Sequence, residues 1–223
     1  MVAGILEKLE QLYGPQQPGW PTDPYLFLVW WHCGYPASDA ACARGWESLK
    51  QSIGMRPEEI SGASQAKLTK ALAPGGMVPE KRAMRLKEIA ARAQELRLEG
   101  PLPKIRKVLK SFPNIGDPGA DRILLFADIA PVAAVPSNGP HVLVRILHGQ
   151  ERENYGVTYR EAQEAIEAGV AKNFEARKRA YLLLKRHGQE TCKRTKPKCD
   201  VCPVAGDCAF RSGKTRGRAS GTR

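Results

Sequence analysis

Apolar residues recur at helical spacing along most of the chain, and clusters of glycine and proline separate these stretches. The clearest example has apolar side chains at Leu102, Ile105, Val108, Leu109 and Phe112, which share one face of a helix. No stretch shows the alternation of a β-strand, so we expect an all-α fold. The same periodicity predicts helices over residues 1–14, 63–72, 80–98, 141–147, 159–172 and 174–187.

The segment after residue 112 reads FPNIGDPGADRIL and predicts a tight turn between two helices. Pro113 ends the first helix, and Asp117 before Pro118 suits an N-cap followed by proline at the first helical position. Gly116 permits a backbone conformation that other residues avoid. Amides at the start of a helix attract anions, so the turn is a candidate phosphate site. The alternative is that it only reverses the chain.

Charge indicates the kind of partner. The 223 residues carry a net charge of +12, with an isoelectric point near 9.6, which favours a polyanion such as nucleic acid. The longest apolar run, Tyr25 to Trp31, is too short to cross a bilayer. We therefore expect no membrane association and a cytoplasmic location, on the nucleoid if the source is bacterial.

Four cysteines near the C-terminus have the spacing C-x6-C-x2-C-x5-C. Thiolates bind soft metals, so this group predicts an iron-sulfur cluster first and a zinc site second. Two disulfides are the remaining alternative. Cys33 and Cys42 are expected to be buried thiols. The predicted metal ligands are Cys192, Cys199, Cys202 and Cys208.

The first cysteine loop is crowded with cations: Lys193, Arg194, Lys196 and Lys198. A metal would hold this loop rigid, and rigid cations lose less entropy on binding, so we expect contact with phosphates rather than a solvated loop. Residues 212–223 form a basic tail that we expect to be disordered.

These motifs together resemble the endonuclease III branch of the helix-hairpin-helix DNA glycosylases. The family's hairpin, L-P-G-V-G-x-x-x-A, is similar to FPNIGDPGA from Phe112 to Ala120. Its H-G-x-x-T-C entry to the cluster is similar to HGQETC from His187 to Cys192. The cysteine spacing is also that of the family, and the resemblance extends over nearly the whole chain.

The resemblance implies two helical lobes with double-stranded DNA bound across them, in a monomer. One lobe would be a six-helix domain at 36–139 that contains the helix-hairpin-helix at about 102–129. The other would combine 1–35 with 140–211 and carry a [4Fe-4S] cluster in the loop 192–208.

The implied DNA-binding residues lie in the hairpin and the cysteine loop. Tyr35 lies near the family position that inserts into the DNA stack where a base has been extruded, although Pro36 is an alternative. In the hairpin the implied contacts are Asn114, Ile115, Gly116 and Gly119.

The chain departs from the family at both catalytic positions. The lysine of family members with lyase activity is replaced by Pro118, which has no amine for a Schiff base. The family's aspartate is replaced by Pro136, which removes the carboxylate that would stabilise a cationic transition state. Asp121 and Asn138 are weak substitutes, since Asp121 also suits a solvated helix acid and Asn138 a cap.

Three functions remain open. The first is a DNA glycosylase that releases a damaged or mispaired base without AP lyase activity, as part of base excision repair. The second is a catalytically silent protein that binds lesions or abasic sites. The third is a zinc-stabilised helical DNA-binding module.

Overall fold

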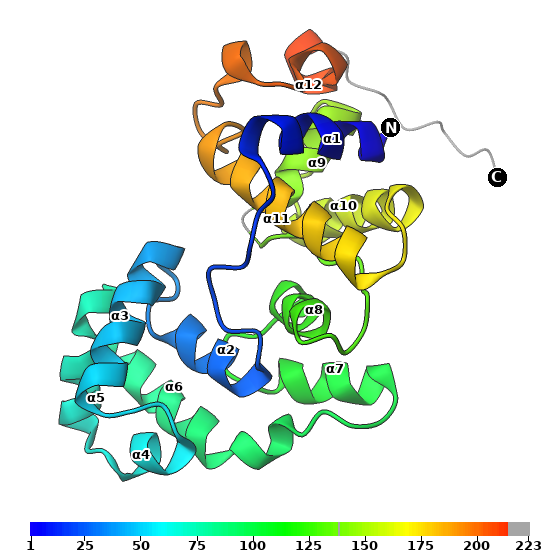
Figure 1. Cartoon of the computed structure of the whole chain (residues 1–223). Coiled ribbons are helices and arrows are strands. Elements are labelled where there is room, and N and C mark those ends of the chain that lie inside the picture. The colour runs from blue at the N-terminus through cyan, green and yellow to red at the C-terminus, as the bar shows by residue number, and fades with distance from the viewer. Residues whose placement is uncertain (138, 214–223) are drawn as a thin grey trace. The chain divides into compact units, whose positions relative to one another are not determined.

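The computed structural model of the protein describes residues 1–137 and 139–213, which form two compact units (Figure 1). Unit 1 combines Met1–Gln17 with the chain from Asp128 onward, and unit 2 is Pro18–Ala127. Every regular element in the described residues is a helix or a short 3-10 turn, which confirms the all-α prediction. The predicted lobe boundaries after residues 35 and 139 lie later in the chain than these unit boundaries, and they stay a prediction about functional lobes.

Unit 2 contains the hairpin. Its helices are α2 (Pro24–His32), α3 (Asp39–Ser52), α4 (Pro57–Gly62), α5 (Gln65–Leu72), α6 (Pro79–Ala91), α7 (Leu102–Lys110) and α8 (Asp117–Phe126).

Several of these helices differ from the periodicity-based predictions. The expected helix 80–98 ends at Ala91 and continues as a 3-10 turn, Ala93–Leu96. Helix α3 was missed because its apolar face is narrow, although Ser38 marks its start by accepting from the Ala41 amide at 3.3 Å.

Arg82 of α6 holds the loops of unit 2 together from inside. The side chain is completely buried, and its guanidinium donates only to backbone carbonyls. The acceptors are Met77 at 3.0 Å, Leu72 at 3.0 Å, Gly76 at 2.6 Å and Cys33. These bonds satisfy carbonyls that buried loops would otherwise leave unpaired.

A second buried cation connects α8 to α2. Arg122 of α8 has its guanidinium carbon 3.7 Å from the ring centre of Trp20, with Phe27, Trp30 and Trp31 also within 5.6 Å. A desolvated cation–π contact contributes on the order of 2 kcal/mol. These contacts fix the second hairpin helix on the aromatic face of α2.

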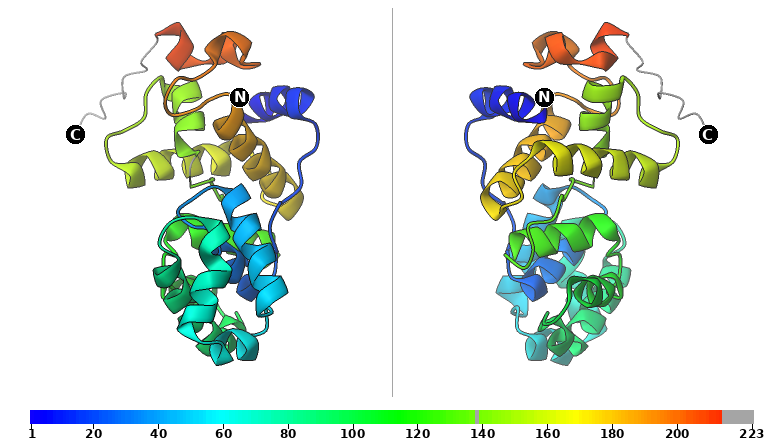
Figure 2. Two further views of the ribbon diagram at one scale, coloured as in Figure 1. Left: turned by 90° about the vertical axis from the view of Figure 1, so that its left-hand side faces the viewer. Right: turned by 90° about the vertical axis from the view of Figure 1, so that its right-hand side faces the viewer.

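Unit 1 is a separate helical core. Its helices are α1 (Val2–Tyr13), α9 (Pro140–His148), α10 (Tyr155–Gly169), α11 (Phe174–Glu190) and α12 (Ala209–Ser212). Helix α1 lies beside α11 in both views of Figure 2, and the two are in contact. The core they share with α9 and α10 includes Ile5, Leu9, Val142, Ile146 and Leu183, and it extends into the cysteine loop through Val204 and Cys208.

Within the described part of the chain, no helix combines the length and the apolar character needed to span a bilayer.

Replacing Arg82 with methionine is expected to destabilise unit 2 by about 3 kcal/mol, because four carbonyl acceptors lose their buried donor. Thermal unfolding should show the loss. Arg97→Met, at an exposed position, is the matched control and should change stability by less than about 0.5 kcal/mol. Equal effects of the two substitutions would contradict this role for Arg82.

Candidate functional site

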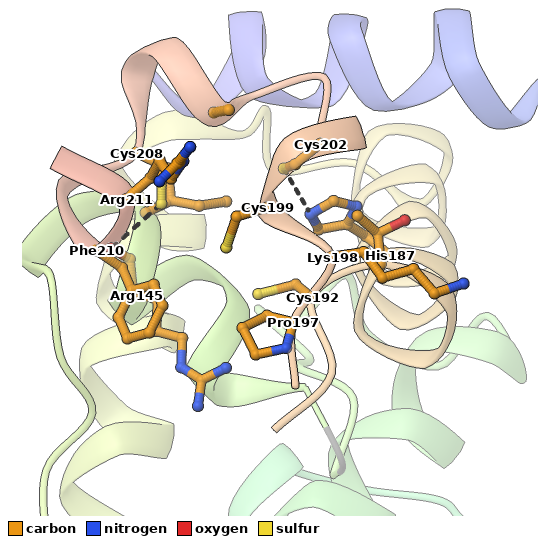
Figure 3. A pocket seen from close by; sticks show the side chains of 13 residues that line it. Arg145, His187, Cys192, Pro197, Lys198, Cys199, Cys202, Cys208, Phe210 and Arg211 are labelled. Atoms are coloured by element: carbon orange, nitrogen blue, oxygen red, sulfur yellow. Dashed lines mark hydrogen bonds between the residues drawn. The ribbon is translucent and has the colours of Figure 1, made fainter. Parts of the chain in front are cut away.

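The four clustered cysteines line one cavity in unit 1 (Figure 3). Cys192 follows α11, Cys199 and Cys202 border the 3-10 turn η3 (Cys199–Val201), and Cys208 precedes α12. None of the six cysteines, all of which are in the described residues, forms a disulfide. The loop therefore gathers four thiol groups around one space.

The four thiols are the kind of ligand that an iron-sulfur cluster uses. Zinc requires its ligands about 2.3 Å from one atom. Within the described residues, no three His, Cys, Asp or Glu side chains converge in a way that could hold one metal ion. In an iron-sulfur cluster the thiolates bind different iron atoms, so they surround the inorganic core rather than meet at a point. The donor set, four thiols that line one cavity, therefore fits an iron-sulfur centre.

Helix α9 fixes the backbone of the loop through Arg145. This buried guanidinium donates to the carbonyls of Lys193 and Arg194, both at 3.0 Å, and to the Glu151 carboxylate at 2.8 Å. The ring of Phe210 covers it at 5.0 Å. The main chain of the basic loop is thus attached to a helix of the core.

One histidine contacts the first of the four cysteines, and another contacts the third. His141 Nε2 lies 2.8 Å from the carbonyl oxygen of Cys192, and His187 Nε2 lies 3.7 Å from Cys202 Sγ. Burial lowers the pKa of both imidazoles, for His187 to about 4, so both rings are neutral near pH 7. Burial also raises the pKa of the Cys192 thiol to about 11, so metal binding there must displace a proton.

The structure brings the four predicted cations of the loop together on its outer side. Lys193, Arg194, Lys196 and Lys198 are all exposed. Only Arg194 among them has a carboxylate partner in the described residues, Glu151 at 2.7 Å. The loop thus presents positive charge to solvent from a fixed backbone.

In unit 2 the hairpin has the predicted form but not the predicted backbone angles. The left-handed residue is Asn114, with φ 56°, whereas Gly116 has φ −94° and extended geometry. Gly116 is also the N-cap, so the prediction that Asp117 caps the helix was wrong by one residue. Asp117 is the first helical residue and accepts from Lys110 Nζ at 2.6 Å.

Buried side chains hold the hairpin from beneath. Phe112 and Ile115 are buried, and Arg92 lies 4.2 Å from the Phe112 ring centre while donating to the Ser111 carbonyl at 3.1 Å. Asn114 and Gly116 remain exposed, and Gly119 is half-buried. The turn therefore offers main-chain groups to solvent from a fixed support.

Asp121 is not the solvated acid that the helical pattern suggested. Its side chain is completely buried and forms an ion pair with Arg106 of α7. The pair joins the two hairpin helices, because the buried carboxylate would be unstable without a cation beside it. Its catalytic role stays a prediction. Asn138, the other weak catalytic candidate, lies outside the described residues.

Tyr35 lies on the loop between α2 and α3. Its ring stacks on Trp31, with ring centres 4.5 Å apart and an interplanar angle of 25°. Pro36 is exposed beside it, and Tyr35 is half-buried. The Arg82 bond to the Cys33 carbonyl fixes the start of this loop.

Comparisons with known proteins agree with this architecture. A family model described as the iron-sulfur binding domain of endonuclease III matches residues 192–208. A solved non-covalent complex of endonuclease III with DNA superposes with a TM-score of 0.75 at 16% identity, covering 97% of both chains.

Two sequence relatives come from archaea. The thymine/uracil-DNA glycosylase of Pyrobaculum aerophilum is 29% identical over 157 residues, 69% of this chain and 66% of that protein. This match therefore spans just under two thirds of the relative. The thymine-DNA glycosylase of Aeropyrum pernix is 23% identical over 202 residues, covering 90% of this chain and 89% of that protein.

The chain therefore resembles endonuclease III in its fold and matches the iron-sulfur binding domain of that protein at residues 192–208. Its iron-sulfur loop is confirmed by the family match to residues 192–208, and the zinc alternative has no support from the comparisons.

One group of cations was not among the predicted DNA-binding residues. An open groove on α7 is lined by Pro103, Arg106, Lys107, Lys110 and Ser111, and it ends where the hairpin begins. The signal was present in the sequence, since LPKIRKVLK has four cations and no acid. The amphipathic pattern of this segment predicts a helix, but we did not expect its cations to contact DNA.

Cys199→Ser is expected to lower the iron content and the broad absorption near about 400 nm, because one thiolate ligand is lost. Cys42→Ala, which changes a buried thiol of unit 2, should retain both. Metal analysis and absorption spectra of the purified proteins make the comparison. A colourless wild-type protein that holds one zinc per chain would contradict the assignment.

Proposed function

We propose that the protein binds double-stranded DNA as a monomer and acts as a DNA glycosylase, hydrolysing the N-glycosidic bond of a damaged or mispaired base. The names of its two archaeal relatives, thymine/uracil-DNA and thymine-DNA glycosylase, support this class of reaction. The endonuclease III fold, solved elsewhere in complex with DNA, supports the partner.

The exposed glycine of the hairpin is the observation that carries the DNA-binding proposal. Gly116 has backbone angles open to other residues, and a Cβ at this position would approach only Pro118 Cδ, at 3.7 Å. The protein's own packing therefore does not require glycine here. A group from outside the protein that approaches the backbone closely would require glycine. At the amides of a helix N-terminus, the expected group is a phosphate.

The cations on both units extend the proposed DNA contact. Lys193, Lys196 and Lys198 on the cysteine loop lie on a backbone that Arg145 holds in place. Lys107 and Lys110 on α7 supply a second group beside the hairpin. Each phosphate that they neutralise releases condensed counterions, which favours binding independently of sequence.

The proposed cofactor is a [4Fe-4S] cluster held by Cys192, Cys199, Cys202 and Cys208. Its contribution here is to replace the apolar core that this loop lacks. The protein's own residues position the DNA.

The proposed reaction does not include strand cleavage. Pro118 is the second residue of α8 and has no amine to form a Schiff base with the sugar. Pro136 is buried where the family has its catalytic aspartate. Without these groups, hydrolysis of the N-glycosidic bond has to depend on another acid or on a positioned water.

A catalytically silent lesion-binding protein is the second candidate. The same two prolines favour it, because they remove the two side chains that the family uses for chemistry while leaving the hairpin intact.

Gly116→Ala is expected to reduce affinity for duplex DNA about tenfold, or ~1.4 kcal/mol, because the new methyl group would meet the phosphate. Its folding stability should stay unchanged, since φ and local space both accept alanine. Gly62→Ala at the end of α4, where a Cβ meets no atom within 4 Å, is the control. Unchanged DNA affinity in Gly116→Ala would remove the hairpin from the interface.

A panel of duplex oligonucleotides with oxidised, deaminated, alkylated and mismatched bases tests the enzyme proposal. At least one base should be released, and the abasic strand should stay intact until it is treated with alkali. Borohydride should trap no adduct on abasic DNA, because Pro118 cannot supply the amine. Tight lesion binding without release would instead favour the silent protein, and a trapped adduct would show that another amine reacts.

A further inference from the structure

A hydrogen-bonded chain connects the N-terminal helix to one of the four clustered cysteines. Tyr13, the last residue of α1, has its hydroxyl 2.9 Å from His187 Nδ1 and 2.7 Å from Thr191 Oγ1. The other ring nitrogen, His187 Nε2, lies 3.7 Å from Cys202 Sγ, as the dashed line in Figure 3 marks. Both imidazole nitrogens therefore have partners.

The chain lies in a buried part of unit 1. His187 is completely buried and Thr191 is 6% exposed. The Tyr13 and His187 rings pack against each other, with centres 6.0 Å apart. Two ion pairs hold α1 in place, Glu10 with Arg179 at 2.8 Å and Lys8 with Asp207 at 2.5 Å. Lys8 thus reaches the cysteine loop itself.

When Cys202 binds metal, only one assignment of donors and acceptors is possible in this hydrogen-bonded series. A metal-bound thiolate has no proton to give, so His187 Nε2 must carry one and donate it to the sulfur. Nδ1 then has a free lone pair and accepts from the Tyr13 hydroxyl. The Tyr13 oxygen in turn accepts from Thr191. Each hydroxyl and each ring nitrogen has one defined role.

We propose that His187 is a positioning residue for the Cys202 thiolate and that Tyr13 holds His187 in the tautomer that donates to sulfur, so that together they raise the reduction potential of the iron-sulfur centre. This inference rests on the proposed cysteine ligation but not on the proposed reaction on DNA.

The physical reason is the negative charge on the sulfur. A donor N–H stabilises a thiolate, and hydrogen bonds to the ligand sulfurs are among the terms that set the potential of such centres. The reduced centre carries one more negative charge than the oxidised one, so the hydrogen bond stabilises it more. Loss of the donor must shift the potential in the negative direction.

Tyr13→Phe tests the contribution of the hydroxyl separately from that of the ring. Phenylalanine retains the packing against His187 but leaves Nδ1 without its donor. The second tautomer, with the proton on Nδ1 and a lone pair facing the thiolate, then becomes accessible, so the N–H to sulfur bond weakens. His187→Leu removes the donor completely, whereas His187→Gln retains an amide N–H.

The test is a potentiometric titration of the purified, iron-loaded proteins, followed by their electron paramagnetic resonance signal. The midpoint potential should shift in the negative direction in Tyr13→Phe and further in His187→Leu, and His187→Gln should restore part of the difference. Tyr155→Phe is the matched control, because it also removes a hydrogen-bonded tyrosine hydroxyl of unit 1, the donor to the Ser137 carbonyl at 2.9 Å, and it should leave the potential unchanged.

Iron analysis of the same samples separates the two ways in which this can fail. Wild-type protein without iron would overturn the ligation proposal and this inference with it. Iron-loaded Tyr13→Phe with the potential of the Tyr155→Phe control would overturn this inference alone. If His187→Leu does not fold, Tyr13→Phe still decides the question.

Discussion

The constraint on which the surface of unit 1 depends is the iron-sulfur loop 192–208, which the proposed metal–thiolate bonds would hold. From residue 192 to 213, only Val204 and Cys208 are buried. Two such side chains contribute about 2 kcal/mol each, whereas ordering the backbone costs about 1 kcal/mol or more per residue. The loop cannot be held by apolar packing, so an inorganic core has to replace it. Arg145 fixes the carbonyls of Lys193 and Arg194, and we expect the inorganic core to order the rest of the loop.

A buried arginine fixes the backbone of a loop in each of the two units. Arg82 in unit 2 and Arg145 in unit 1 each donate to carbonyls of loops that carry candidate DNA contacts. A guanidinium has five donors in one plane, so it can fix several carbonyls at once without a partner helix. These bonds fix the backbone just before two candidate DNA contacts, the half-buried Tyr35 after Cys33 and the exposed Lys196 after Arg194.

Local signals made part of this structure predictable. The cysteine spacing and the amphipathic pattern of α7 involve neighbours in sequence. The iron-sulfur loop and the helix that they predict are both confirmed. Asp121 shows the opposite case, because its burial depends on Arg106, fifteen residues earlier and on another helix. The hairpin was intermediate. Its existence followed from Pro113 and Gly116, but the left-handed residue was Asn114, since turn geometry is set by the packing of Phe112 and Ile115 beneath it.

The cofactor and the tyrosine–histidine chain required different information. Four cysteines specify thiolate chemistry on their own, whereas the contact of Tyr13 with His187 joins residues 174 positions apart. Helical periodicity places each residue on its own helix and gives no indication that they meet. Only the packing of α1 on α11 brings them together.

Hydrogen exchange on protein with the cluster intact, compared with protein from which it has been removed, tests most directly whether the inorganic core organises the loop. We predict that amides from residue 192 to 213 lose protection on removal, while α1, α9, α10 and α11 keep theirs because they share an apolar core. Unchanged protection in the loop would contradict the account, as would a loss that spreads equally through all of unit 1.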